Sequence, residues 1–200
     1  MKDSECIPYR ETGFFSALIG DYLDQKSSLH SFYHRFPKLE EFAAQIKEKA
    51  EHFSLEHRSI LSKALKEQYK DIQAEAELST LTAANLQALV QENTFTVTTG
   101  HQLNLFTGPL YFIYKIISTI NLAEQLSAAY PDKHFVPIYW MASEDHDFEE
   151  INFINLYGGK LRWQSSTGGA VGRMPNYGMG KVIDELEETY CASLITSMVI

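Results

Sequence analysis

One short segment concentrates acidic side chains, the sequence SEDHDFEE at residues 143–150, which directly follows an apolar run. Carboxylates at this spacing raise one another's pKa unless cations or hydrogen bonds intervene. In an extended chain, Asp145 and Asp147 share one face, while Glu144 and His146 share the other. The paired aspartates could bind a substrate ammonium group or Mg²⁺, and His146 could act as an acid or a base.

We therefore assign catalytic roles in this segment to Asp145, His146 and Asp147, and binding roles to Ser143 and Glu144. The alternative interpretation is a solvated acidic turn that begins a helix. The spacing matches no closed zinc site and does not identify a metal.

A second group of polar residues lies in the segment TGHQLNLFTGP, residues 99–109. The apolar helix that follows points its free N–H groups and positive dipole end at this segment, a geometry that holds phosphate or carboxylate. His101 could donate a hydrogen bond to a phosphoryl oxygen or carry a proton. The residues that we assign to substrate or phosphate binding are Thr99, Gly100, His101, Gln102, Thr107 and Gly108.

The same segment also has a plainer interpretation. It can be a tight strand-to-helix turn in which Gly100 and Gly108 adopt unusual backbone angles and His101 is structural. It is not a Walker A loop, because GxxxxGK(S/T) is absent, and not a dinucleotide fingerprint, because no GxGxxG follows the strand.

A single formal charge, Lys115, interrupts the stretch from residue 93 to residue 123 in a chain that is 22% charged. The near absence of charged residues predicts a buried helix, in which Lys115 would be desolvated and would need an anion or a carboxylate beside it. We therefore include Lys115 among the catalytic candidates. The alternatives are a lysine that snorkels to solvent or a structural ion pair with the acidic segment. Tyr111 and its aromatic neighbours are assigned to the core, without a catalytic role.

Two strands and a helix must bring these groups together. The β-branched run at residues 94–99, closed by Gly100, predicts a strand, and HFVPIYWMA at residues 134–142 predicts a second. Between them, Pro109 is expected at the first position of an apolar helix that continues to about residue 126. This βαβ pattern predicts an α/β fold with a Rossmann-like parallel sheet, in which ligands bind beyond the carboxyl ends of the strands.

Glycine separates the chain into two parts, because none occurs between Gly20 and Gly100. Residues 38–92 are rich in helix-forming residues at helical spacing and predict about three helices, the last capped by Thr82. We accordingly expect an N-terminal helical region at 1–93 and the first part of the core at 94–164. The remainder, 165–200, is expected to begin an incomplete inserted segment, with a hairpin or extended stretch before a helix from about Val182.

Composition narrows the classes of function. A formal charge of −9 disfavours nucleic acid and anionic membranes as partners. Two distant cysteines predict neither a disulfide framework nor a cysteine zinc site, which fits the cytoplasm. The first residues lack the pattern of a signal peptide, and no apolar run is long enough to cross a membrane.

Two long motifs resemble a known family. TGHQLNLFTGPLYFIYK and PIYWMASEDHDFEEI are similar, in order and separation, to motifs of the BshC family, the cysteine-adding enzymes of bacillithiol biosynthesis. SSLHSFYHRFPKLEEF also resembles the family's N-terminal helical region. The resemblance covers essentially the whole chain, although family members are more than twice as long, so the chain resembles their N-terminal portion.

The resemblance implies an activity and a set of partners. It implies the last step of bacillithiol synthesis, in which the carboxyl group of cysteine is joined by an amide bond to the amine of glucosaminyl-malate. It implies a Rossmann-like core and a coiled coil that makes a homodimer of the full-length protein. We expect ATP to activate the carboxylate of cysteine, and Mg²⁺ is a candidate ligand of the acidic segment. An isolated part of such a core would expose a sheet edge and an apolar face, which predicts weak stability or association.

The motifs carry over residue by residue. The TGxQ element falls on residues 99–102, where the family commonly has glutamine in place of His101. The FTGP element falls on residues 106–109, followed on the helix by Lys115, and SEDHD falls on residues 143–147. Two other interpretations stay open, a Mg²⁺-dependent nucleotidyl or phosphotransferase that uses the acidic segment and a non-catalytic binding module.

Overall fold

The structure is a computed structural model that describes residues 6–73, 77–156 and 159–198 of the 200-residue chain. Its contacts divide the chain into two compact units, Met1–Ser54 and Leu55–Ile200. Residues 55–92 are grouped with the strands, although they precede the predicted boundary at residue 93. The predicted boundaries at 93 and 164 stay predictions.

The first unit contains short helices held by aromatic and ionic contacts. The ring of Tyr22 lies 5.2 Å from that of Tyr33 and 5.1 Å from that of Phe36. Arg10 forms ion pairs with Asp21 and Asp24. The elements of this unit are η1 (Tyr9–Glu11), α1 (Ala17–Leu23), η2 (Ser27–Phe32), η3 (Leu39–Glu41) and α2 (Phe42–His52).

The second unit begins with two helices, α3 (Leu55–Gln73) and α4 (Thr80–Ala88). Together with α2 they confirm the prediction of about three helices between residues 38 and 92. The cap of α4 was predicted wrongly. Ser79 is the N-cap, and its hydroxyl oxygen accepts a hydrogen bond from the Thr82 N–H at 3.1 Å, so Thr82 lies inside the first turn.

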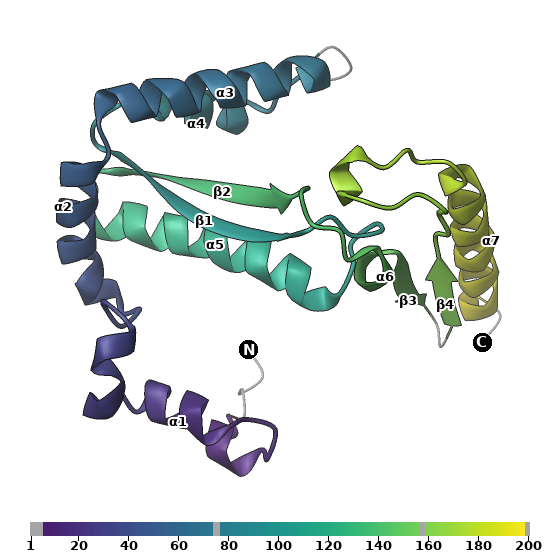
Figure 1. Cartoon of the computed structure of the whole chain (residues 1–200), viewed down its shortest axis with the longest axis horizontal. Helices are drawn as coiled ribbons and strands as arrows, with labels where there is room; N and C mark the ends of the chain where they lie inside the picture. The colour runs from purple at the N-terminus through teal and green to yellow at the C-terminus, as the bar shows by residue number, and fades with distance from the viewer. Residues whose placement is uncertain (1–5, 74–76, 157–158, 199–200) are drawn as a thin grey trace. The chain divides into compact units, whose positions relative to one another are not determined.

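The predicted βαβ unit is confirmed. It consists of β1 (Thr94–Gln102), α5 (Leu110–Ala129) and β2 (His134–Ala142), and the strands pair in parallel (Figure 1). Their register runs from Thr94 opposite His134 to Gln102 opposite Ala142. The first strand is longer than predicted, because its last three residues continue to pair with β2 instead of starting a loop.

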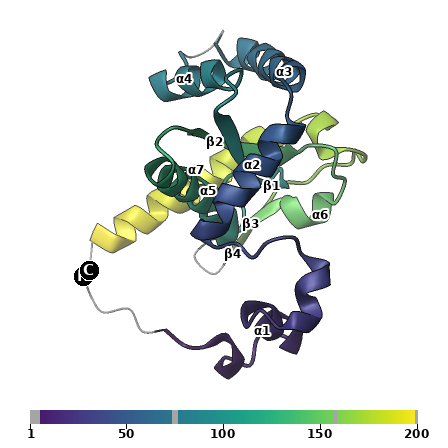
Figure 2. The same cartoon turned by 90° about the vertical axis from the view of Figure 1, so that its left-hand side faces the viewer.

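Helices cover both faces of this two-stranded sheet. On one face, the Phe112 ring of α5 lies 5.5 Å from the ring of Tyr139 in β2. On the other, Leu86 and Leu89 of the α4 region pack with Val136 of β2. The strands therefore lie between α5 and the α3–α4 pair, as Figures 1 and 2 show.

The first turns of α5 are exposed, and the prediction that they are buried is wrong. Leu110 is 63% exposed, Tyr114 61% and Ile117 47%. A helix packed on a two-stranded sheet buries one side, and the buried residues of α5 are Thr119, Ala123 and Leu126. The start of α5 is apolar, as its sequence shows, but the composition of a helix does not determine which elements pack against it.

The chain continues into a second small sheet. After β2 come α6 (Phe148–Ile151), the antiparallel hairpin of β3 (Phe153–Leu156) and β4 (Gly159–Arg162), η4 (Val171–Arg173) and α7 (Met179–Met198). The last helix begins three residues before the predicted Val182. Leu105, from the loop after β1, packs with Leu161, Trp163 and Val182. That contact joins the end of β1 to the C-terminal elements.

Within the described residues, no helix has the length and apolarity that crossing a membrane requires.

Arg58 ties α3 to the start of β1. It is buried, and its guanidinium donates to the carbonyl oxygens of Thr94 at 2.6 Å and Glu92 at 3.2 Å. Burial lowers the pKa of this guanidinium, because the charged form loses water. A charge in this position is stabilised mainly by the carbonyl groups that it satisfies.

We predict that Arg58→Ala lowers the free energy of unfolding by about 2 to 3 kcal/mol, because two backbone carbonyls lose a charged donor. Lys63→Ala, at an exposed position of the same helix, is the control and should change it by less than about 0.5 kcal/mol. Urea unfolding followed by circular dichroism measures both. Equal midpoints for the two variants would contradict the assigned role of Arg58.

Candidate functional site

The carboxyl end of β1 places four predicted binding residues in consecutive strand positions, residues 99–102. Gly100 lies opposite Trp140. A Cβ at Gly100 would lie 3.2 Å from the Cβ and carbonyl oxygen of Trp140, closer than most side chains tolerate. The strand-end glycine therefore allows a close approach of the two strands. Its neighbour Thr99 is half-buried and faces α5.

Lys115 lies near this strand end but is not desolvated, so the prediction of a buried lysine is wrong. Its ammonium group is exposed and donates to the carbonyl oxygen of Gly100 at 3.0 Å. The same ammonium lies 5.8 Å from the centre of the Tyr111 ring. The lysine bridges α5 and β1 through a backbone carbonyl instead of pairing with the acidic segment. It keeps hydrogen-bonding capacity for a ligand.

His101 is the centre of a small hydrogen-bonded network. Its Nε2 lies 2.8 Å from the hydroxyl of Tyr111, and its Nδ1 lies 2.8 Å from the side-chain nitrogen of Asn104. That nitrogen also donates to the carbonyl of Gln102 at 2.9 Å. Tyr139 donates from its hydroxyl to the His101 carbonyl at 3.3 Å. Burial of Tyr139 raises its pKa.

The loop after β1 depends on one glycine in a left-handed conformation. Gly108 has φ +57°, and an added Cβ would lie 2.6 Å from the Cβ of Asn104. The Gly108 N–H donates to the carbonyl of Leu105 at 3.1 Å. Pro109 is the N-cap of α5, so the prediction that it is the first helical residue is wrong. Thr107 is exposed on this loop.

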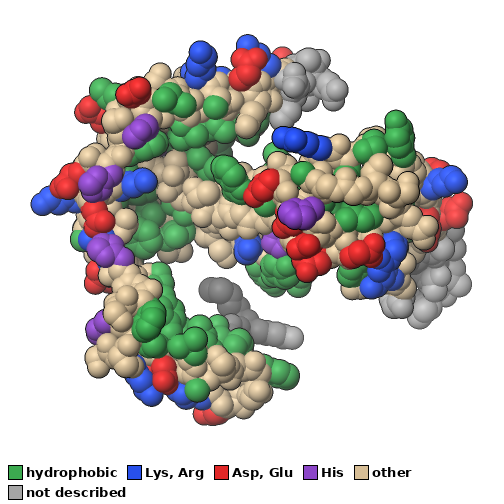
Figure 3. Space-filling view, in the orientation of Figure 1, with side chains coloured by type: hydrophobic (Ala, Val, Ile, Leu, Met, Phe, Trp, Pro, Cys, Tyr) green, Lys and Arg blue, Asp and Glu red, His purple; other side chains and the backbone are tan. Residues whose placement is uncertain are grey.

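The acidic segment forms a turn, so the expectation of an extended chain with alternating faces is wrong. The Asp145 carboxylate accepts a hydrogen bond from the Asp147 N–H at 3.0 Å. The backbone oxygen of Ser143 accepts from Gly172, and that of Asp145 accepts from Val171, at 2.9 and 2.7 Å. These bonds fasten the turn to η4. Figure 3 shows acidic side chains gathered over the stretch between β2 and α6.

Gln102 connects the two predicted groups. Its side-chain N–H donates to the carboxylate of Glu150 at 3.1 Å. The pKa of Asp145 lies below its ordinary value of 3.8, chiefly because the Asp147 N–H and then the Gln102 side chain donate to the ionised carboxylate. The backbone of Leu105 also donates to Ile151 at 2.9 Å. The ends of β1 and β2 therefore meet at one edge.

Other predicted residues are placed further from this junction. His146 and Glu144 are exposed, and Nδ1 of His146 lies 3.4 Å from the Glu144 carbonyl oxygen. Asp147 is exposed and occupies the N-cap position of the short helix α6, without a capping hydrogen bond from its side chain. Lys115 and His101 gather around Gly100 and Tyr111, whereas the acidic residues gather beyond Gln102.

Two contributors were not identified from the sequence. Tyr111 was assigned to the core, and Glu150 was given no role. The available signal was the position of Tyr111 in the first turn of a helix that follows a histidine-bearing loop. Nothing in the sequence fixes its hydroxyl within reach of His101.

The acidic segment contains no ready-made cluster of three metal ligands. Across the residues that the structure describes, no group of three or more histidine, cysteine, aspartate or glutamate side chains converges in a way that could hold an ion. The carboxylate of Asp145 accepts a hydrogen bond from the backbone N–H of Asp147. Because Mg²⁺ is usually held by one or two carboxylates together with substrate phosphates, the Mg²⁺ expectation stays a prediction, and we derive no step through a metal ion.

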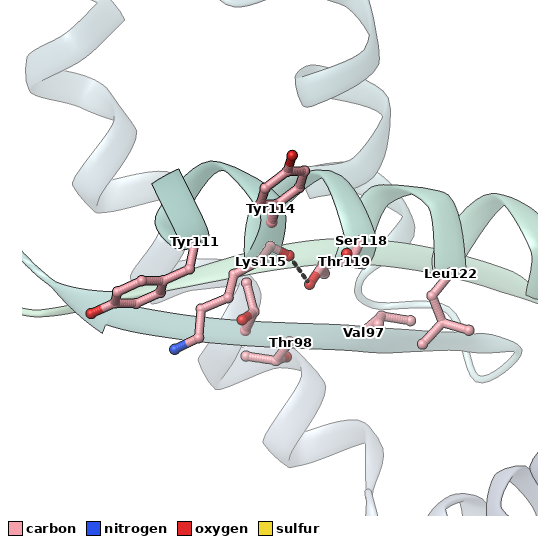
Figure 4. A pocket seen from close by; sticks show the side chains of 9 residues that line it. Val97, Thr98, Tyr111, Tyr114, Lys115, Ser118, Thr119 and Leu122 are labelled. Carbon is pink, nitrogen blue, oxygen red and sulfur yellow. Dashed lines mark hydrogen bonds between the residues drawn. The ribbon is translucent and has the colours of Figure 1, made fainter. Parts of the chain in front are cut away.

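An open groove of about 450 Å³ lies between β1 and α5. Most of its lining side chains carry hydroxyl groups, and it contains Thr99 and Lys115 but neither Gly108 nor an acidic residue. Figure 4 shows Tyr111 and Lys115 reaching from α5 to the strand, while the hydroxyl of Tyr114 points away. The lining residues are Val97, Thr98, Thr99, Tyr111, Tyr114, Lys115, Ser118, Thr119 and Leu122.

The matching family model and the similar curated proteins belong to the same family. The family described as "Bacillithiol biosynthesis BshC, N-terminal Rossmann-like domain" matches residues 2–199. Three curated relatives named "Putative cysteine ligase BshC" are similar to the chain. The Flavobacterium johnsoniae protein is 54% identical over 90% of the chain, that of Christiangramia forsetii 56% over 82%, and that of Cytophaga hutchinsonii 38% over 92%. The matches cover 34%, 30% and 34% of these relatives, so the chain spans about a third of their length.

We predict that Gly108→Ala destabilises the chain by about 1 to 3 kcal/mol, because alanine disfavours a positive φ and its methyl group would meet Asn104. Gly168→Ala is the matched control, since an added Cβ there meets nothing within 4 Å. Urea unfolding midpoints compare the two. A Gly108→Ala variant as stable as the control would show that the loop does not require this conformation.

Asp145→Asn should be most destabilising at neutral pH. The native pKa of Asp145 is lowered, so the unfolded chain binds its proton first as the pH falls. The stabilisation is present above the ordinary pKa and is lost as the pH falls through the native value.

Unfolding free energies of the variant and the unaltered chain should therefore converge between about pH 5 and pH 2. A constant difference across that range would contradict the assignment. Gln102→Ala, which removes the second donor, should raise the pKa of Asp145 in an NMR titration of its carboxyl carbon.

Proposed function

Because this chain belongs to the BshC family, as its N-terminal Rossmann-like domain, we propose that it forms part of an enzyme that joins cysteine to glucosaminyl-malate. The reaction is the last step of bacillithiol biosynthesis, and the new bond is an amide between the cysteine carboxyl group and the sugar amine. The observation that carries the proposal is the junction at Gln102. There the loop that follows β1 and a carboxylate-rich turn meet at one sheet edge.

Amide formation from a free carboxylate requires activation, and we propose ATP as its source. A carboxylate oxygen of cysteine attacks a phosphorus atom of ATP and forms a mixed anhydride. The bond from that phosphorus to its bridging oxygen breaks, which releases pyrophosphate after attack at the α-phosphorus or ADP after attack at the γ-phosphorus. The amine of glucosaminyl-malate then attacks the carbonyl carbon. The phosphate-bearing group leaves with the former carboxylate oxygen, and the amine gives up a proton.

The loop at residues 100–109 and the start of α5 have the chemistry for the anionic reactants. Backbone N–H groups at a helix N-terminus stabilise phosphate or carboxylate oxygens. Lys115 is exposed beside Gly100 and supplies a positive charge at that end of the strand. We assign to Lys115 the stabilisation of negative charge that develops during activation and attack.

The acidic turn has the chemistry for the amine. Asp145 is ionised at neutral pH, as an aspartate with an ordinary pKa also is, and its carboxylate is suited to orient an ammonium or amine group. Its lowered pKa makes Asp145 a weak base. We therefore propose that one of the exposed neighbours, His146 or Asp147, accepts the proton that the amine loses.

The setting of the reaction is also proposed. The substrates are small molecules, and a formal charge of −9 disfavours nucleic acid and anionic membranes. The reducing cytoplasm suits the free thiol of the product. The family resemblance alone supports a homodimer of the full-length protein.

The test joins this chain to the remaining two thirds of the Flavobacterium johnsoniae relative. Incubated with cysteine, glucosaminyl-malate and ATP, the fusion protein should form bacillithiol, detected by mass spectrometry. Lys115→Met should lower the rate about 100-fold to 1,000-fold, as the loss of one charge-stabilising donor does in other enzymes.

The matched control is Lys181→Met, which removes the same charge from an exposed position of α7. It should leave the rate within about twofold, because exposed charges far from a site act weakly. Absence of bacillithiol with every nucleoside triphosphate tested would contradict the ligase. Equal rates for the two lysine variants would contradict the role of Lys115.

A further inference from the structure

The hydroxyl of Tyr111 contacts the side chain of His101, although Tyr111 lies in the mostly apolar first turn of α5. Its hydroxyl is 2.8 Å from Nε2 of His101, and the two ring centres are 5.0 Å apart. The side chain is half-exposed, at 52%. A hydroxyl held in this way has one hydrogen atom and two lone pairs to distribute between His101 and a ligand.

Asn104 determines which ring nitrogen of His101 carries the proton. The Asn104 nitrogen donates one hydrogen to the Gln102 carbonyl, which fixes the orientation of the amide. The same nitrogen lies 2.8 Å from Nδ1 of His101, so its second hydrogen points at a ring nitrogen that must accept. Nδ1 also lies 3.1 Å from the Gln102 carbonyl, a longer contact that would require the opposite tautomer.

The proton arrangement at Tyr111 follows from this tautomer. With Nδ1 accepting, the neutral imidazole carries its proton on Nε2 and donates it to the Tyr111 oxygen. The phenolic hydrogen of Tyr111 is then not used by His101. It is left as a fixed donor at the carboxyl end of β1, where ligands of parallel sheets bind.

Lys115 supplies the matching charge. Its ammonium group lies 5.8 Å from the centre of the Tyr111 ring and donates to the Gly100 carbonyl, in the residue before His101. Figure 4 shows the Tyr111 and Lys115 side chains reaching the same strand from one helix. A neutral O–H donor and an ammonium group that reach one strand end from the same helix are suited to a carboxylate or phosphate group.

We propose that Tyr111 is a binding residue that donates its phenolic hydrogen, together with Lys115, to an anionic oxygen of the substrate. Asn104 and His101 are positioning residues that keep this hydrogen free by fixing the tautomer. The identity of the substrate, a carboxylate or a phosphate, rests on the proposed function. The arrangement of hydrogen-bond donors does not depend on that function.

The tautomer is tested in the free chain by long-range ¹H–¹⁵N NMR correlation. The spectrum distinguishes a protonated Nε2 from a protonated Nδ1, and at a pH where the ring is neutral we expect His101 to be protonated on Nε2. Asn104→Ala should move the proton toward Nδ1, because the Gln102 carbonyl then becomes its acceptor. A proton on Nδ1 in the unaltered chain would overturn the proposal, whether or not bacillithiol is formed.

Binding is tested by calorimetry with two probes, L-malate for a carboxylate and inorganic phosphate for a phosphate. Tyr111→Phe should weaken at least one of them about tenfold, the effect of losing a hydrogen bond to a charged group. The probe that is weakened identifies the chemical class of the ligand. Tyr114→Phe is the matched control, one residue before Lys115 with its hydroxyl pointing away, and should change neither affinity.

Asn104→Ala separates positioning from packing. It should weaken the same probe as Tyr111→Phe, and the double variant should be no weaker than Tyr111→Phe alone, because both act through one hydrogen atom. Equal affinities for Tyr111→Phe and the unaltered chain, or no binding of either probe, would overturn the proposal. Failure of the fusion protein to make bacillithiol would contradict the proposed function alone.

Discussion

The parallel pairing of β1 and β2 over nine residues fixes the rest of the candidate site. Because Gln102 lies opposite Ala142, the chain leaves both strands at the same level of the sheet. The loop after β1 and the acidic turn after β2 therefore begin side by side. A shift of one residue would move every side chain of one strand to the opposite face and would separate His101 from Tyr111.

This register places two groups of side chains with different chemistry next to each other at the strand ends, and short polar contacts hold them there. Around Gly100, the side chains are a histidine, a tyrosine and an exposed lysine from α5. Beyond Gln102, they are carboxylates held by backbone N–H groups and by the Gln102 amide. One side suits anionic oxygens and the other suits an amine. The proposed amide formation between an acid and an amino sugar would use both kinds of group.

Local signals were sufficient for the βαβ unit but not for its contacts. The bounds of β2 agree with the β-branched and aromatic run at residues 134–142. The extension of β1 through Gln102 depends on pairing with residues 40 positions away, which no local pattern encodes. Lys115 was expected to be buried because its neighbours are apolar, yet burial depends on what packs against α5. Tyr111 received no role because aromatic residues in apolar helices usually belong to cores.

The central claim, that substrates bind across both strand ends, is tested most directly by amide chemical shifts. A ¹⁵N-labelled sample of this chain is titrated with glucosaminyl-malate. We expect the amides of residues 100–102 and 145–147 to shift together and to saturate with one dissociation constant. Shifts confined to one of these segments, or two different constants for the two segments, would contradict a shared binding site.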